Sequence, residues 1–402
     1  MDQVNNKSIC PYAFRGAMIN VDSTVKPCCR YQQRYGSARV KVTDTFSIHD
    51  AFHSQYYQDL RKKMLAGEKV PGCVRCYKEE EAGQKSMRND NTLLTASTDI
   101  ELEYLEVESG RHCNLKCRSC NPELSSGWNE DIKNNNELAT EYGFNDQLDE
   151  LESFMYNDGL EHVSKENCIK LKTIKATGGE PFLSKSFLKL IDNLDKWDLA
   201  KNIKLEVYTN VSFMPKPKFV EALLKLKTVE LNMSIDSIGK RNDYLRSNSD
   251  WDTTNRVVDY WCKLASEHPN KVRLVVSNTV SILNVLTLNL LISYVANKEK
   301  QFGVYTDISH TVVHWPKYLA VYNFPRNIKD KIIKSIKEIP STTNIPNYKA
   351  LGVQRIIGML ERSTPTTVSA KKDFIYTTDS IDKVRDESWK TVFPEVLKLL
   401  RG

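Results

Sequence analysis

Three cysteines stand close together in the run His112-Cys113-Asn114-Leu115-Lys116-Cys117-Arg118-Ser119-Cys120. This C-x3-C-x2-C triplet follows a strand-like segment at 102–107. Three thiolates this close can hold three corners of a cubane [4Fe–4S] cluster and leave one iron open for an exchangeable ligand. A structural zinc site instead needs four closed ligands, usually in two separated pairs, and a disulfide needs an even number of cysteines. The spacing therefore predicts an iron–sulfur centre with one open iron.

The bulk properties are those of a globular chain without a membrane segment. Its 402 residues allow two or three domains, and no apolar run reaches the roughly 18 residues of a membrane span. The first seven residues lack the pattern of a signal peptide, so we expect a cytoplasmic location, where ten cysteines are better explained as metal ligands than as disulfides. The formal charge of +6 forms no single block, which makes nucleic acid an unlikely partner.

The order of secondary-structure patterns predicts three regions. Residues 1–95 hold five of the ten cysteines and suggest a small metal-binding module, whereas 96–325 alternate strand and helix patterns. The strand candidates are 102–108, 171–176, 203–209, 229–235, 272–280 and 303–314. The helix candidates include 185–198, 217–227, 252–267 and 284–298. Such alternation predicts an α/β fold with a parallel sheet, closed or half-closed as a barrel.

Two parts of the chain carry less information. After residue 325, apolar residues at helical spacing predict an amphipathic helix and then a helical extension over 326–402, in which no motif is recognisable. The polar stretch 121–170 is long for the first loop of a barrel. It is either a solvated helical insertion or a lid that contacts substrate, because loops after barrel strands border the active site.

A second motif, Thr177-Gly178-Gly179-Glu180-Pro181, follows the second strand candidate. Together with the cysteine triplet it resembles the radical S-adenosylmethionine (SAM) superfamily, whose fold is a partial (β/α)6 barrel of TIM type. The resemblance implies that the three cysteines bind a [4Fe–4S] cluster and that SAM chelates the open iron. Gly178, Gly179 and Glu180 would then lie along the methionine end of SAM, since glycines permit close backbone approach and a carboxylate accepts from an ammonium group.

Further polar residues at strand ends match family positions that bind SAM. Thr209 and Asn210 end the third strand candidate, and Ser234 and Asp236 end the fourth. Ligands bind at the carboxyl ends of barrel strands, although these residues could also simply be turn formers. Arg246 is a candidate partner of the SAM carboxylate and could equally be a surface arginine.

The amino-terminal cysteines resemble a twitch (half-SPASM) domain, which holds one auxiliary [4Fe–4S] cluster on four cysteines. The implied ligands are Cys10, Cys28, Cys73 and Cys76, with Cys29 as the spare or as a replacement for Cys28. In many relatives this domain follows the barrel, whereas here it precedes it. The same four cysteines would also suit a closed zinc site.

The remaining candidates have simpler interpretations. Cys168 and Cys262 belong to neither set and are expected to be small buried hydrophobic residues. His310 and His314 share one face of the last strand candidate, where a structural role is favoured over substrate contact. Ser277-Asn278, on the fifth strand candidate, is a weaker match to the strand-end pattern.

The resemblance implies an enzyme. It would reductively cleave SAM to a 5′-deoxyadenosyl radical that abstracts hydrogen from an unidentified substrate, with an auxiliary cluster taking up the substrate electron in a net oxidation or crosslink. The substrate would be a peptide or a small molecule, and the electron would come from a donor such as flavodoxin or ferredoxin. The alternative is a non-catalytic zinc or iron–sulfur binding module on a barrel scaffold.

Overall fold

The computed structural model describes most of the chain, in two compact units. The described residues are 8–32, 40–81, 83, 85–90, 94, 97–142, 152–153, 155–156, 158–339, 347–363 and 369–401. The first unit comprises 1–112, 153–207 and 216–229, and the second comprises 113–152, 208–215 and 230–402. Parts of the expected regions 1–95, 121–170 and 326–402 therefore lie outside the described residues.

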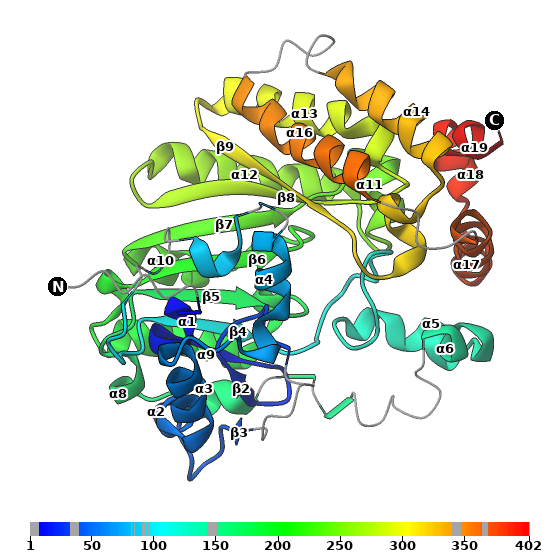
Figure 1. The fold of residues 1–402 in the computed structure, drawn as a ribbon. Helices are drawn as coiled ribbons and strands as arrows, with labels where there is room; N and C mark the ends of the chain where they lie inside the picture. Colours follow the sequence, from blue (N-terminus) through cyan, green and yellow to red (C-terminus); the bar gives the residue numbers. More distant parts are fainter. Residues whose placement is uncertain are drawn as a thin grey trace. The chain divides into compact units, whose positions relative to one another are not determined.

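The strands confirm an α/β fold in which the last six strands follow one another in chain order (Figure 1). The hydrogen-bonded order is β3-β2-β1-β4-β5-β6-β7-β8-β9. Pairing is parallel for β1 with β4, β4 with β5, β5 with β6 and β8 with β9, and antiparallel for β1 with β2 and β2 with β3. The predicted partial barrel of TIM type corresponds to β4–β9, and the amino-terminal strand β1 extends it beyond β4.

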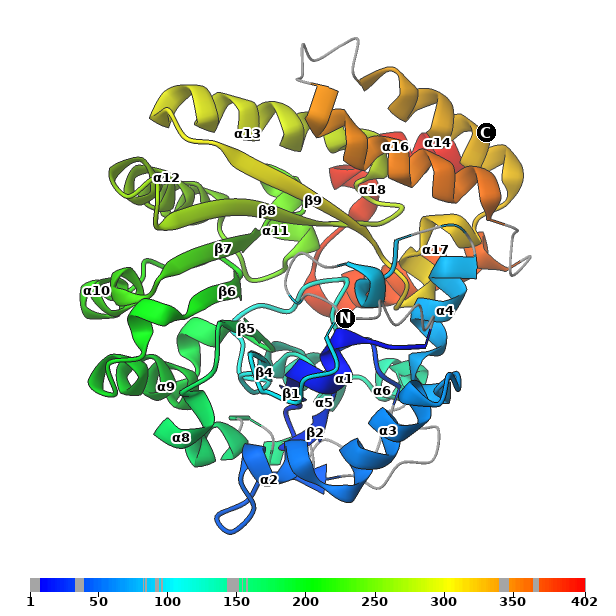
Figure 2. The same ribbon diagram turned by 60° about the vertical axis from the view of Figure 1, so that its left-hand side comes forward.

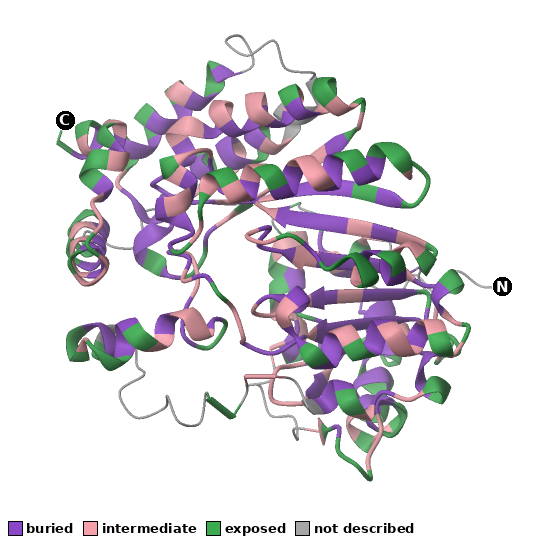
Figure 3. Cartoon of the chain, turned by 180° about the vertical axis from the view of Figure 1, so that it is seen from behind, coloured by how far each residue is buried: buried purple, intermediate pink, exposed green. Residues whose placement is uncertain are grey.

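The six predicted strands are present within a few residues of their expected bounds. They are β4 Tyr104–Glu108, β5 Thr173–Thr177, β6 Lys204–Thr209, β7 Thr228–Ser234, β8 Val272–Val280 and β9 Thr306–Val312. The amino-terminal strands are β1 Gly16–Ile19, β2 Thr24–Lys26 and β3 Val40–Lys41. Most of the barrel strands were predictable because their apolar or β-branched residues are buried, as the largely purple strands of Figure 3 show, whereas β9 is mostly half-buried or exposed.

The first unit also contains the amino-terminal helices and two of the crossover helices. They include α1 Pro11–Arg15, α2 Ile48–His53, α3 Gln55–Leu65, α4 Val74–Glu81, α8 Lys165–Cys168, α9 Lys185–Lys196 and α10 Pro217–Lys225. Helix α9 shows why the pattern was readable: Phe187, Leu190, Ile191 and Leu194 are buried at the i, i+3, i+4, i+7 spacing of one helix face. The Ser184 hydroxyl caps its first turn by accepting from the Phe187 N–H.

The second unit contains most of the remaining helices, several of which Figure 2 shows beside β8 and β9. They are α5 Asn129–Lys133, α6 Asn136–Tyr142, α11 Lys240–Leu245, α12 Trp251–Glu267, α13 Leu288–Phe302, α14 Arg326–Lys337, α16 Asn347–Arg362, α17 Ala370–Arg385, α18 Trp389–Val392 and α19 Pro394–Arg401. Helix α12 packs on β8, and α16 packs on β9 and α14. The expected helical carboxy-terminal part is thus confirmed. None of the helices in the described part of the chain is long and apolar enough to cross a membrane.

One helix begins later than predicted. The expected start of α13 was residue 284, but the α-helix begins at Leu288. The Asn284 side chain instead accepts from the Ser281 N–H at 2.7 Å and donates to the Thr279 carbonyl at 2.9 Å. Because an asparagine that bonds nearby backbone groups stabilises a turn in place of a helix, a short 3₁₀ segment at Val285–Thr287 precedes α13.

Candidate metal centres

The cysteine triplet lies on a loop that follows β4. All ten cysteines are described, and none forms a disulfide. Cys117 is buried, and Cys113 and Cys120 are partly exposed. Burial raises the pKa of the Cys117 thiol, and the nearby Arg246 guanidinium opposes that increase. Metal ligation requires the thiolate, so binding at this loop would release protons.

A short segment after the triplet, residues 125–128, holds the loop by hydrogen bonds to its backbone. The Ser125 hydroxyl donates to the Leu115 carbonyl at 2.6 Å, and the Trp128 indole N–H donates to the Cys117 carbonyl at 3.2 Å. A Cβ added to Gly127 would come within 2.4 Å of the Leu115 carbonyl oxygen, so only glycine permits this approach. The sequence prediction missed these residues. Their position immediately after the triplet was the signal that could have identified them.

Asn210 contacts the triplet directly. Its amide nitrogen lies 3.7 Å from the Cys113 sulfur and donates to the Asn114 side-chain oxygen at 2.9 Å. Its own oxygen accepts from the Ser212 N–H at 3.1 Å. Thr209, the other predicted residue at this strand end, is buried, and its hydroxyl accepts a local backbone N–H. The structure therefore brings Asn210 to a predicted cluster ligand, whereas the Thr209 hydroxyl bonds the nearby Val211 N–H.

Arg246 and Asp236 form a buried ion pair in the second unit. The Arg246 Nη1 donates to Asp236 Oδ2 at 3.0 Å, and the other Asp236 oxygen accepts from the Thr279 N–H at 2.7 Å. Among the described residues, the buried Arg246 Nε has no hydrogen-bond partner. The geometry therefore favours Asp236 as the residue that orients Arg246, which keeps one N–H for a ligand. Ser234, at the end of β7, is partly exposed.

The Gly-Gly-Glu segment belongs to the first unit and continues the β4–β5 pairing beyond the strand ends. The Gly179 N–H donates to the Gly110 carbonyl at 2.7 Å, and the Glu180 N–H donates to the His112 carbonyl at 2.8 Å. Gly178 has a φ of +119°, which side chains rarely adopt. The Glu180 carboxylate is buried and accepts from the Phe182 N–H at 3.1 Å. The motif is thus held against the residues that immediately precede Cys113 in sequence.

Gly179→Ala is expected to disturb this pairing strongly. The new Cβ would lie 2.4 Å from the His112 carbonyl oxygen and 2.7 Å from the Arg111 carbonyl carbon, both of which are backbone atoms. We expect a loss of about 1–3 kcal/mol in the free energy of unfolding and weaker SAM binding, measured by denaturant titration and by SAM titration of the loaded protein. Gly303→Ala is the control, because it has φ +66° but no atom within 4 Å of its added Cβ. Equal effects at both positions would contradict the prediction.

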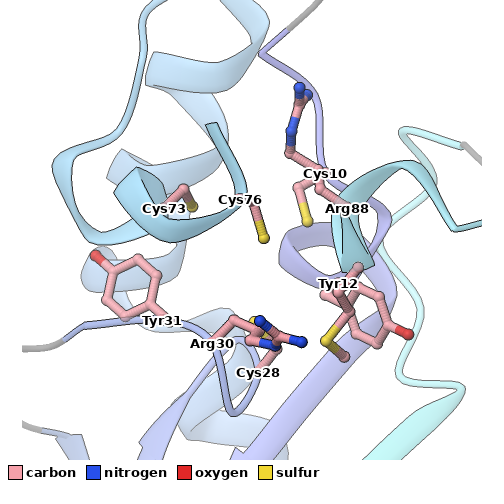
Figure 4. A pocket seen from close by; sticks show the side chains of 9 residues that line it. Cys10, Tyr12, Cys28, Arg30, Tyr31, Cys73, Cys76 and Arg88 are labelled. Atoms are coloured by element: carbon pink, nitrogen blue, oxygen red, sulfur yellow. The ribbon is translucent and has the colours of Figure 1, made fainter. Parts of the chain in front are cut away.

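Four amino-terminal cysteines line one pocket in the first unit. Figure 4 shows Cys10, Cys28, Cys73 and Cys76 around a common space. They come from separate elements, because Cys10 precedes α1, Cys28 follows β2, Cys73 ends the 3₁₀ turn Pro71–Cys73, and Cys76 lies in α4. The pocket encloses about 280 Å³, its open mouth included. The structure therefore brings together the four residues that the twitch resemblance selected.

Two arginines line the pocket with the cysteines (Figure 4), and each is paired with a carboxylate. Arg30 pairs with Glu79 at 2.6 Å, and Arg88 pairs with Glu80 and donates to the Ile9 carbonyl at 2.9 Å. Burial raises the pKa of the Cys10 thiol to about 12. Across the part of the chain that the structure describes, no three His, Cys, Asp or Glu side chains converge on a single metal-ion position.

Cys29 lies outside this set. Its sulfur contacts the Met87 sulfur at 4.0 Å, and it is not among the residues that line the pocket. The geometry thus favours Cys28 over Cys29 as the fourth ligand. Cys168 and Cys262 are each only 1% exposed, in agreement with their predicted role as small buried residues.

The two histidines of β9 and its end have local partners. His314 is exposed, and its Nδ1 lies 3.2 Å from the Tyr322 hydroxyl. His310 Nδ1 lies 2.9 Å from Asn278 Oδ1, and the Asn278 amide nitrogen donates to the Asp236 carbonyl at 3.0 Å. Since the Asn278 amide nitrogen is occupied in this way, its oxygen must accept, and His310 carries its proton on Nδ1. Each histidine thus has a structural partner, and among the described residues the buried His310 Nε2 has none.

His310 is expected to make the protein less stable at acidic pH. Burial lowers its pKa from 6.5 to about 4, so the native state holds the ring neutral. The unfolded state binds more protons below pH 6.5, and the stabilisation is therefore lost as pH falls from about 6.5 toward 4, by about 2 kcal/mol. His310→Asn keeps a donor for Asn278 but cannot titrate. Denaturant titrations at pH 7 and pH 4.5 should show a smaller drop for the variant, and parallel drops would rule the effect out.

Comparison with known proteins finds partial similarities. No family model matches the chain. Over 144 residues it is 28% identical to GTP 3′,8-cyclase of Mannheimia succiniciproducens, and this stretch is 36% of each protein, so the match spans about a third of that relative. Among solved structures, the chain is similar to anSMEcpe with bound AdoMet, with a TM-score of 0.39 and 16% identity over 60% of this chain and 62% of that one. It is also similar to Streptococcus suis SuiB bound to S-adenosylmethionine, with a TM-score of 0.34 and 11% identity over 82% of this chain and 68% of SuiB.

Proposed function

We propose that this chain is a radical SAM enzyme. Cys113, Cys117 and Cys120 would hold a [4Fe–4S] cluster whose fourth iron binds SAM. When bound, these cofactors supply reductive cleavage of SAM to a 5′-deoxyadenosyl radical, which takes a hydrogen atom from the substrate. The observation that carries the proposal is the hydrogen-bonded loop after β4, which carries three cysteines within eight residues, none of them in a disulfide. The partial identity with a GTP 3′,8-cyclase adds support.

The residues around the loop have roles that suit SAM. The buried Arg246 keeps an unpartnered N–H, which suits the SAM carboxylate, and Asp236 holds the guanidinium in place. Gly178, Gly179 and Glu180 would lie along the methionine end of SAM. Their backbone is hydrogen-bonded to residues 110–112, and the glycines permit this close packing, which holds the motif beside the start of the cysteine loop. Thr209, Asn210 and Ser234 are further proposed SAM contacts, and Asn210 also donates toward the Cys113 sulfur.

The amino-terminal pocket would hold a second cluster. Cys10, Cys28, Cys73 and Cys76 offer four thiolates and no open position, an arrangement that suits electron transfer better than substrate ligation. Arg30 and Arg88 line the same pocket, each paired with a carboxylate, Glu79 or Glu80. With this site as electron acceptor, the net reaction is an oxidation or a crosslink. This assigns a twitch-type role to residues 1–95.

The substrate class and the electron donor follow from the same scheme. The substrate would be a peptide or a small molecule with an unactivated carbon, and the reducing electron would come from a flavodoxin or ferredoxin in the cytoplasm. The domain bounds proposed are 1–95 for the auxiliary module, 96–325 for the partial barrel and 326–402 for the helical extension.

The test is anaerobic incubation of the iron-loaded protein with SAM and dithionite, with 5′-deoxyadenosine quantified by chromatography. We expect 5′-deoxyadenosine to form together with methionine. About eight irons and eight sulfides per chain, with absorbance near 400 nm that decreases on reduction, are expected for two cubanes. A colourless protein with about one zinc would instead indicate the non-catalytic module. Full loading without 5′-deoxyadenosine would reject the enzyme.

A further inference from the structure

A carboxy-terminal arginine is attached to the backbone of the cysteine loop. Arg385, at the end of α17, has a side chain that is 1% exposed. Its Nη1 donates to the Lys116 carbonyl at 2.8 Å and to the Ser247 hydroxyl at 3.1 Å, and its Nε donates to Asp131 at 2.7 Å. Lys116 immediately precedes the predicted ligand Cys117. One buried guanidinium therefore fixes the backbone at the middle of the triplet.

The same arginine also rests on the residue that holds Cys117. The Arg385 guanidinium lies 4.4 Å from the centre of the Trp128 ring, and the Trp128 indole donates to the Cys117 carbonyl. A planar guanidinium over an indole face is a favourable cation–π contact, which is stronger when the pair is desolvated. Arg385 and Trp128 thus hold two consecutive carbonyls of the loop, those of Lys116 and Cys117.

A second contact joins the same helix to the other half of the triplet. Arg118 lies between Cys117 and Cys120, and its Nη2 pairs with Asp382 of α17 at 2.6 Å and also with Glu387. Its guanidinium lies 4.2 Å from the centre of the Tyr244 ring, whose hydroxyl donates to Asp382 at 2.6 Å. The contacts of α17 with the loop are therefore charged and buried on both sides of Cys117.

The charges in this network balance. Three cations face three carboxylates, which are Lys116, Arg118 and Arg385 with Asp131, Asp382 and Glu387. Removing one member of a buried network leaves an uncompensated charge, which costs several kcal/mol, whereas an exposed pair contributes little. A shift of α17 relative to the loop would therefore separate buried charges from their partners.

We propose that α17 is a positioning element of the cluster site, in which Arg385 holds the loop geometry and supplies one of the positive charges that balance the carboxylates around the loop. This inference rests on the proposed function, since it presumes a cluster on the triplet. Residues that orient metal ligands commonly change metal affinity by about tenfold to a hundredfold when they are replaced. A cation near a cluster favours its reduced, more negative state and so raises its reduction potential.

The first test measures iron loss to a ferrous chelator under anaerobic conditions. Arg385→Met removes the planar guanidinium with its several N–H donors and its charge while retaining much of the side-chain volume. Arg385→Lys retains the charge but not the guanidinium. Lys383→Met is the matched control, because Lys383 is exposed on the same helix. We expect about four irons to leave Arg385→Met at least about tenfold faster than wild type, with Arg385→Lys intermediate and Lys383→Met unchanged. The other four irons serve as the internal reference for an intact fold.

The second test is a redox titration of the triplet cluster, a readout that a purely structural role would not shift in both directions. Arg385→Met should lower its potential and Asp131→Asn should raise it, while Arg385→Lys should stay close to wild type. The inference is overturned if Arg385→Met changes neither the potential of the triplet cluster nor its rate of iron loss. It is also overturned if both clusters lose iron equally fast. If wild type holds no four irons on the triplet, the proposed function itself fails, which is a distinguishable result.

Discussion

Replacing Cys113, Cys117 and Cys120 together by alanine is expected to abolish SAM cleavage. These thiolates would be the only protein ligands of the cluster that binds SAM. Without them the cluster cannot bind to the protein, and SAM has no iron to chelate. We expect the variant to lose about four irons and four sulfides per chain and 5′-deoxyadenosine to fall to background. Iron and sulfide assays and chromatography of the reaction mixture, all anaerobic, measure both effects.

The matched control for this variant is Cys262→Ala. Cys262 is buried in α12 and belongs to neither cysteine set, so its replacement should leave the iron content and SAM cleavage at wild-type levels. Retention of the amino-terminal irons in the triple variant would show that the first unit is still folded. If the triple variant lacks the four irons of the triplet and still forms 5′-deoxyadenosine, the assignment of the triplet is refuted.

Replacing Cys73 and Cys76 together by alanine is expected to remove the other four irons. Two of the four thiolates that line the amino-terminal pocket would be lost, and a cubane cannot be held by the remaining pair. SAM cleavage should persist, because the triplet is intact, but the substrate oxidation that depends on an electron acceptor should be lost. Iron content and 5′-deoxyadenosine yield, measured on the same preparation, separate this outcome from general misfolding.

Single substitutions at the neighbouring cysteines sharpen this result. Cys28 lines the pocket whereas Cys29 does not and instead contacts the lining residue Met87, so Cys28→Ala should lose the second cluster and Cys29→Ala should keep it. The reverse result would show that Cys29 is the fourth ligand. One zinc per chain in wild type, lost with Cys73→Ala and Cys76→Ala, would replace the auxiliary cluster with a structural zinc site.

Most of the regular structure could be predicted because its signals are local. The apolar and β-branched residues of β5, β6 and β8 and the one-sided apolar spacing of α9 are visible in the sequence. They are there because the buried faces of strands and helices require apolar side chains at a regular spacing. The start of α13 could not be read, because the Asn284 side chain bonds backbone groups that only the folded turn brings near. Nor could the addition of β1 to β4 be foreseen, since strand pairing depends on contacts distant in sequence.

The sequence by itself determined the types and the spacing of the proposed cluster ligands, because the loop is short and its cysteines are neighbours in the chain. It could also nominate Cys10, Cys28, Cys73 and Cys76, although only the tertiary structure gathered these distant residues around one pocket and left Cys29 outside it. The same holds for the support of the triplet. Arg385 lies far from Cys117 in sequence and has no motif, and its role depends on burial and on distances that exist only in the folded chain.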